Sequence, residues 1–345
     1  MSGNAAYTHT DVIKERLGIE VTTQCNIHCL HCFVRARVSE PSSLSIKLAK
    51  QILAEGYSVG YHHFHITGGE PLLWEGLFDV LDYAFDIGYE TGFLNTNGTL
   101  LTVDVSSRLA TYNGLSISVS LEATETLHDH LRGEGSYRQA VQGIERVLVA
   151  GIDLIIFTIA CKSLLSDLSI FAEDLYKKFP GIKYLTLIQF IPVGDGTFTL
   201  SEELLGPEDF LQLVGKVSLL NLFGLRTCFL NNPLAFVASK LLKILWIPAS
   251  EPLYCKGSMI VMANRDICLS HFSTDTFGKY ELGMIEKVLT SGLYRKAVMP
   301  DERTCPSCKY SEFCKENGMV HPLEFYWDAK PNILYCQEVL DNIRG

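Results

Sequence analysis

The sequence lacks the features that direct a chain into a membrane or onto nucleic acid. No uncharged apolar run reaches the roughly 18 residues of a membrane span, and the first 18 residues contain no apolar signal segment. Basic residues are also few: 29 Lys and Arg are outnumbered by 39 Asp and Glu, giving a net charge of −10. This balance does not predict a nucleic-acid-binding surface. We therefore expect a cytoplasmic protein with no membrane span and no nucleic-acid partner.

Cysteine, in contrast, is grouped in two parts of the chain. Of 11 cysteines, three lie within residues 25–32 and six within residues 255–336, while Cys161 and Cys228 stand alone. Disulfides suit small secreted scaffolds, and a chain of 345 residues with 47% hydrophobic residues can bury a core without them. In a reducing compartment, grouped thiols predict metal or redox chemistry instead.

The first half of the chain alternates short β-branched runs with amphipathic stretches of helix length. Six βα units in succession predict an α/β fold with parallel strands, either a partial (β/α)6 barrel or an open doubly wound sheet. Reactive groups then belong at the carboxyl ends of the strands. The expected strands are 18–22, 62–66, 91–96, 115–121, 153–159 and 183–190, and the expected helices are 44–55, 77–87, 103–112, 136–150 and 165–179.

The pattern changes after about residue 200. Helical stretches at 207–222 and 233–246 are followed by a Pro-rich break, and then by the cysteine-rich tail. We expect a TIM-like partial barrel at 1–200, a helical connection at 201–250, and a small α+β domain at 251–345.

Three thiols follow the first expected strand directly. Cys25, Cys29 and Cys32 form a Cx3Cx2C pattern. Three thiolates on a short loop can hold three irons of a [4Fe–4S] cube and leave the fourth iron open for a ligand. The alternative is zinc completed by His28 or His31, but this spacing fits ordinary zinc motifs poorly.

This segment resembles the radical S-adenosylmethionine (radical SAM) enzymes. The match is their Cx3CxΦC motif, in which Leu30-His31 stands where the family usually has an aromatic residue in the second slot. The resemblance implies that the open iron chelates the methionine end of SAM. It also implies that an electron from the cluster cleaves SAM to methionine and a 5′-deoxyadenosyl radical, which takes a hydrogen atom from a substrate.

Two loops after later strands extend the resemblance. Residues 67–71 read Thr-Gly-Gly-Glu-Pro and resemble the family's GGE motif, which holds the SAM amino group. Gly68 and Gly69 would permit close backbone approach to a ligand, and Glu70 would accept from an ammonium. Asn97, in a Thr-Asn-Gly segment, corresponds to residues that line the SAM pocket.

The fourth expected strand and the segment after it supply further SAM-binding candidates. Ser116, Ser118 and Ser120 share one face of that strand. If this face lines a barrel, Ser118 and Ser120 can contact the ribose of SAM; otherwise it is a polar outer face. Residues 128–137 resemble an HDxxRGxGSF stretch of the family, which makes Arg132 a candidate partner of the SAM carboxylate or a member of a surface ion pair.

The tail cysteines resemble the auxiliary-cluster domain called SPASM, or its shorter twitch variant. The resemblance then covers about residues 18–336 and implies at least one auxiliary [4Fe–4S] cluster. The candidate ligands are Cys255, Cys268, Cys305, Cys308, Cys314 and Cys336. Cys255 and Cys268 are expected at the two ends of a β-hairpin.

One position departs from the SPASM pattern, because Gly318 stands where the family has a further cysteine. Three ligand arrangements stay open. The first auxiliary cluster is absent; or it has an open or non-cysteine ligand, with Asp266, His271 and Glu316 nearby; or one twitch-type cluster uses Cys255, Cys268, Cys305 and Cys308. A structural zinc ion in the tail is the alternative to all three.

Cys161 and Cys228 have no metal-binding spacing. Buried apolar cysteines are common, so packing alone accounts for both. The sharper hypothesis is that one of them donates a hydrogen atom to a substrate radical, as an epimerase requires.

The resemblance implies a peptide or protein substrate and an external electron donor of the flavodoxin or ferredoxin type. Cys25 lies so near the start that we expect no separate leader-binding domain before it. The same radical chemistry on a small molecule or cofactor precursor is the second hypothesis. A zinc-binding interaction protein without catalysis is the third.

Overall fold

A computed structural model of the chain describes residues 16–32, 34, 40–190, 200–230, 232–244, 258–269, 271, 276–298, 336 and 338–343. In chain order its elements are β1 (Leu17–Thr22), α2 (Ile46–Ser58), β2 (His63–Gly68), η2 (Pro71–Leu73), α3 (Leu77–Asp86), β3 (Thr91–Thr96), α4 (Val103–Leu109), β4 (Leu115–Ser120), α5 (Glu125–Arg132), α6 (Ser136–Val149), β5 (Asp153–Ala160), α7 (Lys162–Lys178), β6 (Tyr184–Gln189), η3 (Ser201–Glu203), α9 (Pro207–Leu222), β7 (Thr227–Phe229), α10 (Pro233–Leu241), β8 (Met259–Val261), β9 (Ile267–Cys268), α11 (Met284–Leu289) and α12 (Gly292–Val298).

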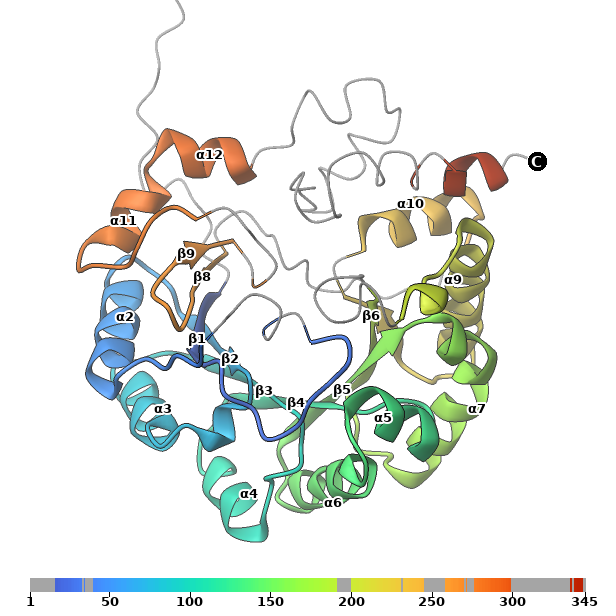
Figure 1. Cartoon of the computed structure of the whole chain (residues 1–345), viewed down its shortest axis with the longest axis horizontal. Helices are drawn as coiled ribbons and strands as arrows, with labels where there is room; N and C mark the ends of the chain where they lie inside the picture. Colours follow the sequence, from blue (N-terminus) through green and yellow to red (C-terminus); the bar gives the residue numbers. More distant parts are fainter. Residues whose placement is uncertain are drawn as a thin grey trace, which may run out of the picture.

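The strands form one curved sheet in the order β7-β6-β5-β4-β3-β2-β1-β8-β9. Neighbours from β7 through β1 to β8 pair in parallel, and only β8 and β9 pair antiparallel. The helices α2 to α7 and α9 lie outside the arc of strands (Figure 1). This arrangement confirms the α/β fold with a parallel, barrel-like sheet.

The sheet is wider than the six strands expected from the sequence. β7 and β8 add a short parallel strand at either edge of that set. The three residues of β7 are too few for an alternating pattern to be recognised. The β8–β9 hairpin was expected from the sequence, but the pairing of β8 with β1 was not. Because β8 pairs with β1, the sheet continues across residue 250 into the segment that we expected to form a separate domain.

The two faces of the strands differ in chemistry. In β4, Ile117 and Val119 have no exposed surface, and Val119 lies on the side of the sheet where α6 packs. The alternation of side chains therefore places Ser116, Ser118 and Ser120 on the concave face. This face is the barrel interior, as the first of our two interpretations requires.

Local capping explains where several helices begin. Ser45, Thr102 and Thr124 precede α2, α4 and α5, and each side-chain oxygen accepts a hydrogen bond from a backbone N–H three residues later. The helix that follows Thr124, α5, was not expected from the sequence. Eight residues give little periodicity, yet this helix carries His128 and Arg132 into the barrel mouth.

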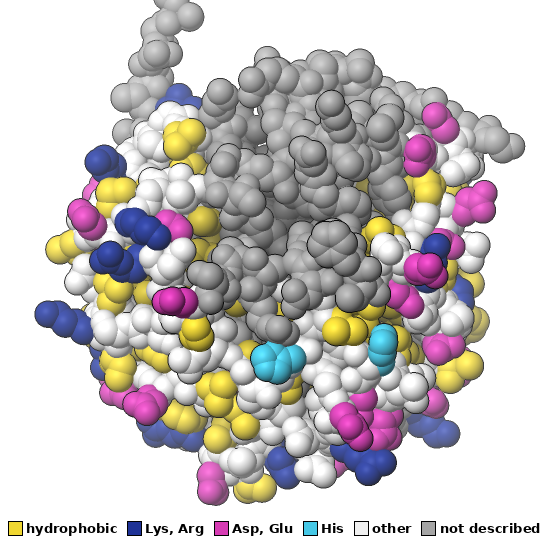
Figure 2. All heavy atoms as spheres, viewed as in Figure 1, with side chains coloured by type: hydrophobic (Ala, Val, Ile, Leu, Met, Phe, Trp, Pro, Cys, Tyr) yellow, Lys and Arg dark blue, Asp and Glu magenta, His cyan; other side chains and the backbone are white. Residues whose placement is uncertain are grey.

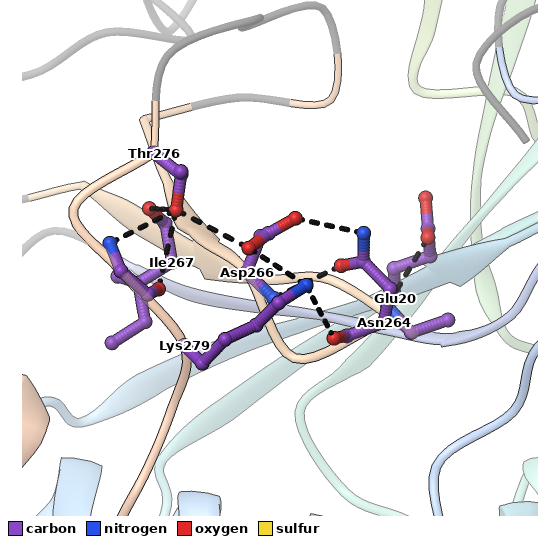
Figure 3. A network of polar contacts seen from close by, with 8 residues as sticks. Glu20, Asn264, Asp266, Ile267, Thr276 and Lys279 are labelled. Carbon is purple, nitrogen blue, oxygen red and sulfur yellow. Dashed lines mark hydrogen bonds and ion pairs between the residues drawn. The ribbon is translucent and has the colours of Figure 1, made fainter.

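The β8–β9 hairpin is fastened to the barrel and to the segment that follows it. The Ala263 N–H donates to Glu20 Oε1 of β1 at 3.2 Å. Asp266 accepts from Asn264 Nδ2 at 2.7 Å and pairs with Lys279 Nζ at 3.0 Å (Figure 3). The turn therefore has a fixed position against β1, the strand that leads into the cysteine loop.

A buried carboxylate on α2 holds the start of α11. Glu55 accepts from the Tyr280 hydroxyl at 2.8 Å and from the N–H groups of Gly283 and Ile285 at 3.0 and 2.7 Å. Gly283 is the N-cap residue of α11 and Ile285 lies in its first turn, and the positive end of a helix favours a carboxylate. Figure 1 shows α11 beside α2. This contact attaches the C-terminal segment to the barrel.

The outer surface carries charges of both signs. Lys or Arg and Asp or Glu side chains are interspersed around the rim of the described surface (Figure 2). Among the described residues, no helix is long and apolar enough to span a membrane.

We predict that Glu55→Gln loosens the C-terminal segment. The amide keeps the volume but cannot accept from three donors, so at least one buried donor loses its partner, at about 2 kcal/mol of unfolding free energy. Chemical denaturation measures the loss, and hydrogen exchange of the Gly283 and Ile285 amides measures the local release. Glu281→Gln, at an exposed position in the same segment, should change neither; equal effects in both variants would contradict the assignment.

Candidate active site

The three clustered cysteines lie in the loop that leaves the carboxyl end of β1. Cys25, Cys29 and Cys32 follow Thr22, the last residue of that strand. The Cys32 N–H donates to the Cys29 carbonyl at 3.2 Å, and Leu30 N–H donates to the carbonyl of Leu131 in α5 at 2.8 Å. The loop is thus bonded to the far side of the barrel mouth, which is where parallel α/β folds place reactive groups.

The two glycines of the GGE segment lie against the backbone of the cysteine loop. A Cβ atom on Gly68 would lie 2.3 Å from the Thr22 carbonyl oxygen, and one on Gly69 would lie 2.2 Å from the Gln24 carbonyl oxygen. The Gly69 N–H donates to Thr22 O at 2.7 Å. The close approach is therefore made to the backbone that leads into the cysteine loop, and only glycine permits it.

Glu70 joins this loop to the end of β3. Its carboxylate accepts from the N–H groups of Leu72 and Asn97 at 3.1 and 2.7 Å, and from the Thr96 hydroxyl at 2.8 Å. Burial raises the pKa of Glu70 to about 7, and the three hydrogen bonds act in the opposite direction. These three donors belong to the chain, and a further contact with the SAM ammonium stays a prediction.

Asn97 connects β3 to the cysteine loop. Its Nδ2 donates to Asn26 Oδ1 at 2.9 Å and lies 3.7 Å from Cys25 Sγ. Its Oδ1 accepts from the N–H and the hydroxyl of Thr99 at 2.9 and 2.7 Å. The side chain that we predicted to line the SAM pocket thus contacts a predicted cluster ligand.

Arg132 forms a buried ion pair with Glu122 and is not part of a surface ion pair. Two of its three guanidinium nitrogens are occupied by this contact. Its Nε and Nη2 lie 2.9 and 2.7 Å from Glu122 Oε1. The second oxygen of Glu122 accepts from the Thr158 hydroxyl and the Ile159 N–H. The remaining Nη1 lies 3.9 Å from Cys29 Sγ, so Arg132 reaches the cysteine loop from the side opposite Asn97.

The serines of β4 are placed on the concave face below these residues. Ser118 is buried and donates to Asn95 Oδ1 at 2.7 Å, and Ser120 is partly buried. The His65 ring packs against Phe93 and His271, with centroids 5.4 and 6.0 Å apart. Burial and the neighbouring His271 lower the pKa of His65 well below its usual range.

The two isolated cysteines lie at different depths of the barrel. Cys161 follows the carboxyl end of β5 and is 2% exposed. Cys228 lies in β7 opposite Thr186, near the amino end of β6, with its sulfur 3.3 Å from that hydroxyl. Burial raises the pKa of both thiols. Of these two cysteines, Cys161 is the one at the edge of the sheet that carries the cysteine loop.

Most of the tail cysteines lie outside the described residues, namely Cys255, Cys305, Cys308 and Cys314. Cys268 is buried in β9, and Cys336 is partly buried. Ile260 of β8 pairs with both Gly18 of β1 and Cys268, so one predicted auxiliary ligand is two strands from the start of β1. Asp266, a possible non-cysteine ligand, is bonded within the hairpin turn.

The chemistry of the cysteine loop fits an iron–sulfur cube. Side-chain N–H groups of Asn97 and Arg132 approach the sulfurs of two cysteines in this loop, Cys25 and Cys29. Hydrogen-bond donors of this kind favour the thiolate form. His31, the alternative zinc ligand, has its Nδ1 buried with no hydrogen-bond partner in the described part of the chain.

Sequence reasoning missed Glu122, Asn26 and Thr99. Glu122 directly follows β4 and has no exposed surface. In the sequence, Glu122 could have been noticed as a charged residue at the end of a strand that alternates serine with apolar residues. Asn26 and Thr99 gave no signal, because they meet only after the chain folds: Asn26 Nδ2 donates to Thr99 Oγ1 at 2.8 Å.

We predict that Glu70 makes stability depend on pH. Because its pKa is about 7 in the folded state and lower in the unfolded chain, the folded state binds more protons between pH 4.5 and 7. The unfolding free energy therefore falls as pH rises through this interval, by at most about 1.4 kcal/mol per pH unit. Chemical denaturation of SAM-free protein at several pH values measures the slope. In Glu70→Gln this part of the slope should vanish; an unchanged slope would assign it to another group.

Residues 19–162 match the model of the family described as "Radical SAM superfamily". The mycofactocin maturase MftC of Mycobacterium tuberculosis is 32% identical over 134 residues, which are 38% of this chain and 34% of that protein. The AdoMet-dependent heme synthase of Methanosarcina barkeri is 32% identical over 180 residues, 51% of each protein. The chain thus spans a third to a half of these curated relatives.

Solved structures share the fold at lower identity. SuiB of Streptococcus suis, bound to its precursor peptide SuiA, aligns with a TM-score of 0.68 at 18% identity over 90% of this chain and 76% of SuiB. The structure of native anSMEcpe with bound AdoMet aligns with a TM-score of 0.65 at 14% identity over 95% of this chain and 98% of that one. Residues 19–162 thus match the radical SAM model, and the chain shares the fold of these solved structures.

Proposed function

We propose that this protein is an enzyme that reductively cleaves S-adenosylmethionine and takes a hydrogen atom from a peptide or protein substrate. The observation that carries the proposal is the position of Cys25, Cys29 and Cys32 at the carboxyl end of β1. The GGE segment, Asn97 and Arg132 surround the same loop. In the superfamily such a loop implies a [4Fe–4S] cluster and SAM.

Each part of this site has a task in the proposed reaction. When bound, the reduced cluster supplies the electron that cleaves SAM to methionine and a 5′-deoxyadenosyl radical. The three cysteines would hold the cluster. Burial raises the pKa of the Cys29 thiol to about 11, an effect that the Arg132 charge opposes. Ser118 and Ser120 line the concave face on which a nucleoside would lie, and Gly68, Gly69 and Glu70 position the loop above it.

The proposed substrate class rests on the relatives. The mycofactocin relative is named as a maturase, and SuiB was solved bound to the precursor peptide SuiA. Both support a peptide or protein substrate. An auxiliary cluster held by the tail cysteines, and an external low-potential electron donor, belong to the same proposal. A small-molecule substrate is the second candidate, because the heme synthase match extends over half of the chain.

The first test is metal and sulfide analysis of anaerobically purified protein. We predict four iron and four sulfide for each cluster, and 5′-deoxyadenosine when SAM and reductant are added. Triple replacement of Cys25, Cys29 and Cys32 by alanine should abolish SAM cleavage while the protein stays folded. Zinc without iron or sulfide would contradict the enzyme and support the zinc-binding interaction protein.

The substrate class is tested on the active enzyme. Incubation with SAM, reductant and candidate peptides should change peptide mass or introduce deuterium from D2O. Formation of 5′-deoxyadenosine that is stimulated only by tetrapyrrole or nucleotide precursors would support the small-molecule alternative.

If the reaction is an epimerisation, we predict that Cys161 donates the hydrogen atom. Its S–H would transfer hydrogen to the substrate carbon radical, and the resulting thiyl would be restored by one electron from the external donor and one proton. In D2O, Cys161→Ala should end deuterium uptake into the product, because alanine has no exchangeable hydrogen to donate. Cys228→Ala, which replaces a buried cysteine near the other end of the barrel, is the matched control. Loss of uptake in Cys228→Ala alone would reverse the assignment.

A further inference from the structure

Two side-chain N–H groups approach the sulfurs of the cysteine loop from opposite sides of the barrel mouth. Asn97 Nδ2, after β3, lies 3.7 Å from Cys25 Sγ, and Arg132 Nη1, at the end of α5, lies 3.9 Å from Cys29 Sγ. Hydrogen bonds to sulfur are longer than those to oxygen because the sulfur atom is larger. Both contacts are therefore N–H···S hydrogen bonds to predicted cluster ligands.

The orientation of the Asn97 amide follows from its other partners. Its Oδ1 accepts from the Thr99 N–H, which can only donate, so the oxygen must face Thr99. Nδ2 consequently faces the cysteine loop, where one hydrogen is donated to Asn26 Oδ1 at 2.9 Å. The second hydrogen is left for Cys25 Sγ. Asn26 also donates to Thr99 Oγ1, which closes the ring of contacts.

Arg132 is held in place by the carboxylate of Glu122. Glu122 Oε1 accepts from its Nε, and the two side chains are buried. Glu122 is in turn fixed by Thr158 and the backbone of β5. Nη1 is therefore presented to Cys29 by a preorganised pair, and not by a flexible side chain.

Donors of this kind change the energy of a redox centre. Reduction adds one electron to an iron–sulfur cube, and part of the added charge resides on the ligand sulfurs. Hydrogen bonds to those sulfurs stabilise the reduced form more than the oxidised form, which raises the reduction potential. No covalent bond forms or breaks in this step, and the electron comes from the low-potential donor.

We propose that Asn97 and Arg132 are positioning residues that raise the reduction potential of the cluster through Cys25 and Cys29. This inference rests on the proposed function, because it requires a [4Fe–4S] cluster on the loop. It assigns both residues a task in the absence of SAM, beyond the SAM contacts expected from the sequence. A role in SAM binding alone predicts no effect on the SAM-free cluster.

The test is the midpoint potential of the SAM-free cluster, measured by EPR-monitored potentiometry with dithionite as electron source. Asn97→Leu replaces the amide by a side chain of the same shape without donors, and should make the potential more negative. Asn97→Asp keeps the acceptor for Thr99, loses both donors and adds a negative charge, so its shift should be larger. Arg132→Lys keeps the pairing with Glu122 but withdraws the planar donor from Cys29, and should shift the potential in the same direction.

The matched control is Asn95→Leu. Asn95 lies two residues earlier on the same strand, and its Oδ1 accepts from Ser118 instead of facing a cluster ligand. This control should keep the wild-type potential. Deuterium exchange adds a direct readout, because pulsed EPR of the reduced wild type should detect an exchangeable deuteron near the cluster that is weaker or absent in Asn97→Leu.

The outcomes separate this inference from the proposed function. A wild-type protein without iron and sulfide would contradict the proposed function itself. A loaded cluster whose potential and deuteron coupling are the same in wild type and Asn97→Leu would overturn the inference and leave the proposed function standing. Equal shifts in Asn97→Leu and Asn95→Leu would also overturn it, because the effect would then be general to the barrel interior. Asn97→Asp, which retains the turn, provides the measurement if Asn97→Leu loses its cluster.

Discussion

The cysteine loop depends on a backbone contact between the first two strands. Gly68 and Gly69 lie against Thr22 and Gln24 so closely that no Cβ atom fits between them, and the Gly69 and Glu70 N–H groups donate across this junction. Glu70 then extends the junction to β3 through Thr96 and the Asn97 backbone. Three consecutive parallel strands thereby set the position of the loop. Any side chain that separated them would move all of its thiols together.

The opposite side of the loop is held by the backbone hydrogen bond from Leu30 to Leu131 and by a charged side chain. Arg132 and Glu122 form an ion pair with little exposed surface. Such a pair is costly to desolvate, and it is retained only where hydrogen bonds satisfy both partners. Here Thr158 and the β5 backbone donate hydrogen bonds to the Glu122 carboxylate, and Cys29 lies near the remaining nitrogen of the Arg132 guanidinium. The pair thus preorganises a positive charge beside sulfurs that must become thiolates.

The β8–β9 hairpin and α11 are attached to the barrel at three points. β8 pairs with β1, Ala263 donates to Glu20, and Glu55 holds the first turn of α11. The same strand, β1, pairs with the hairpin and leads into the cysteine loop. A displacement of the hairpin would therefore also move the loop. Cys268 lies on this hairpin. A cluster held there would therefore have a defined position relative to the barrel.

The sequence alone determined the parallel α/β architecture and the grouping of chemistry at the carboxyl ends of strands, because both follow from periodicity and from short motifs. Cys25, Cys29 and Cys32 could be identified because their spacing is local. Only the tertiary structure decided that β7 and β8 widen the sheet and that the GGE glycines pack on the backbone of the cysteine loop. It also decided that Glu122 forms an ion pair with Arg132. It likewise brought Asn97 to Cys25, 72 residues apart in the chain. Contacts of this kind depend on strand register and on burial, which no local pattern of residues encodes.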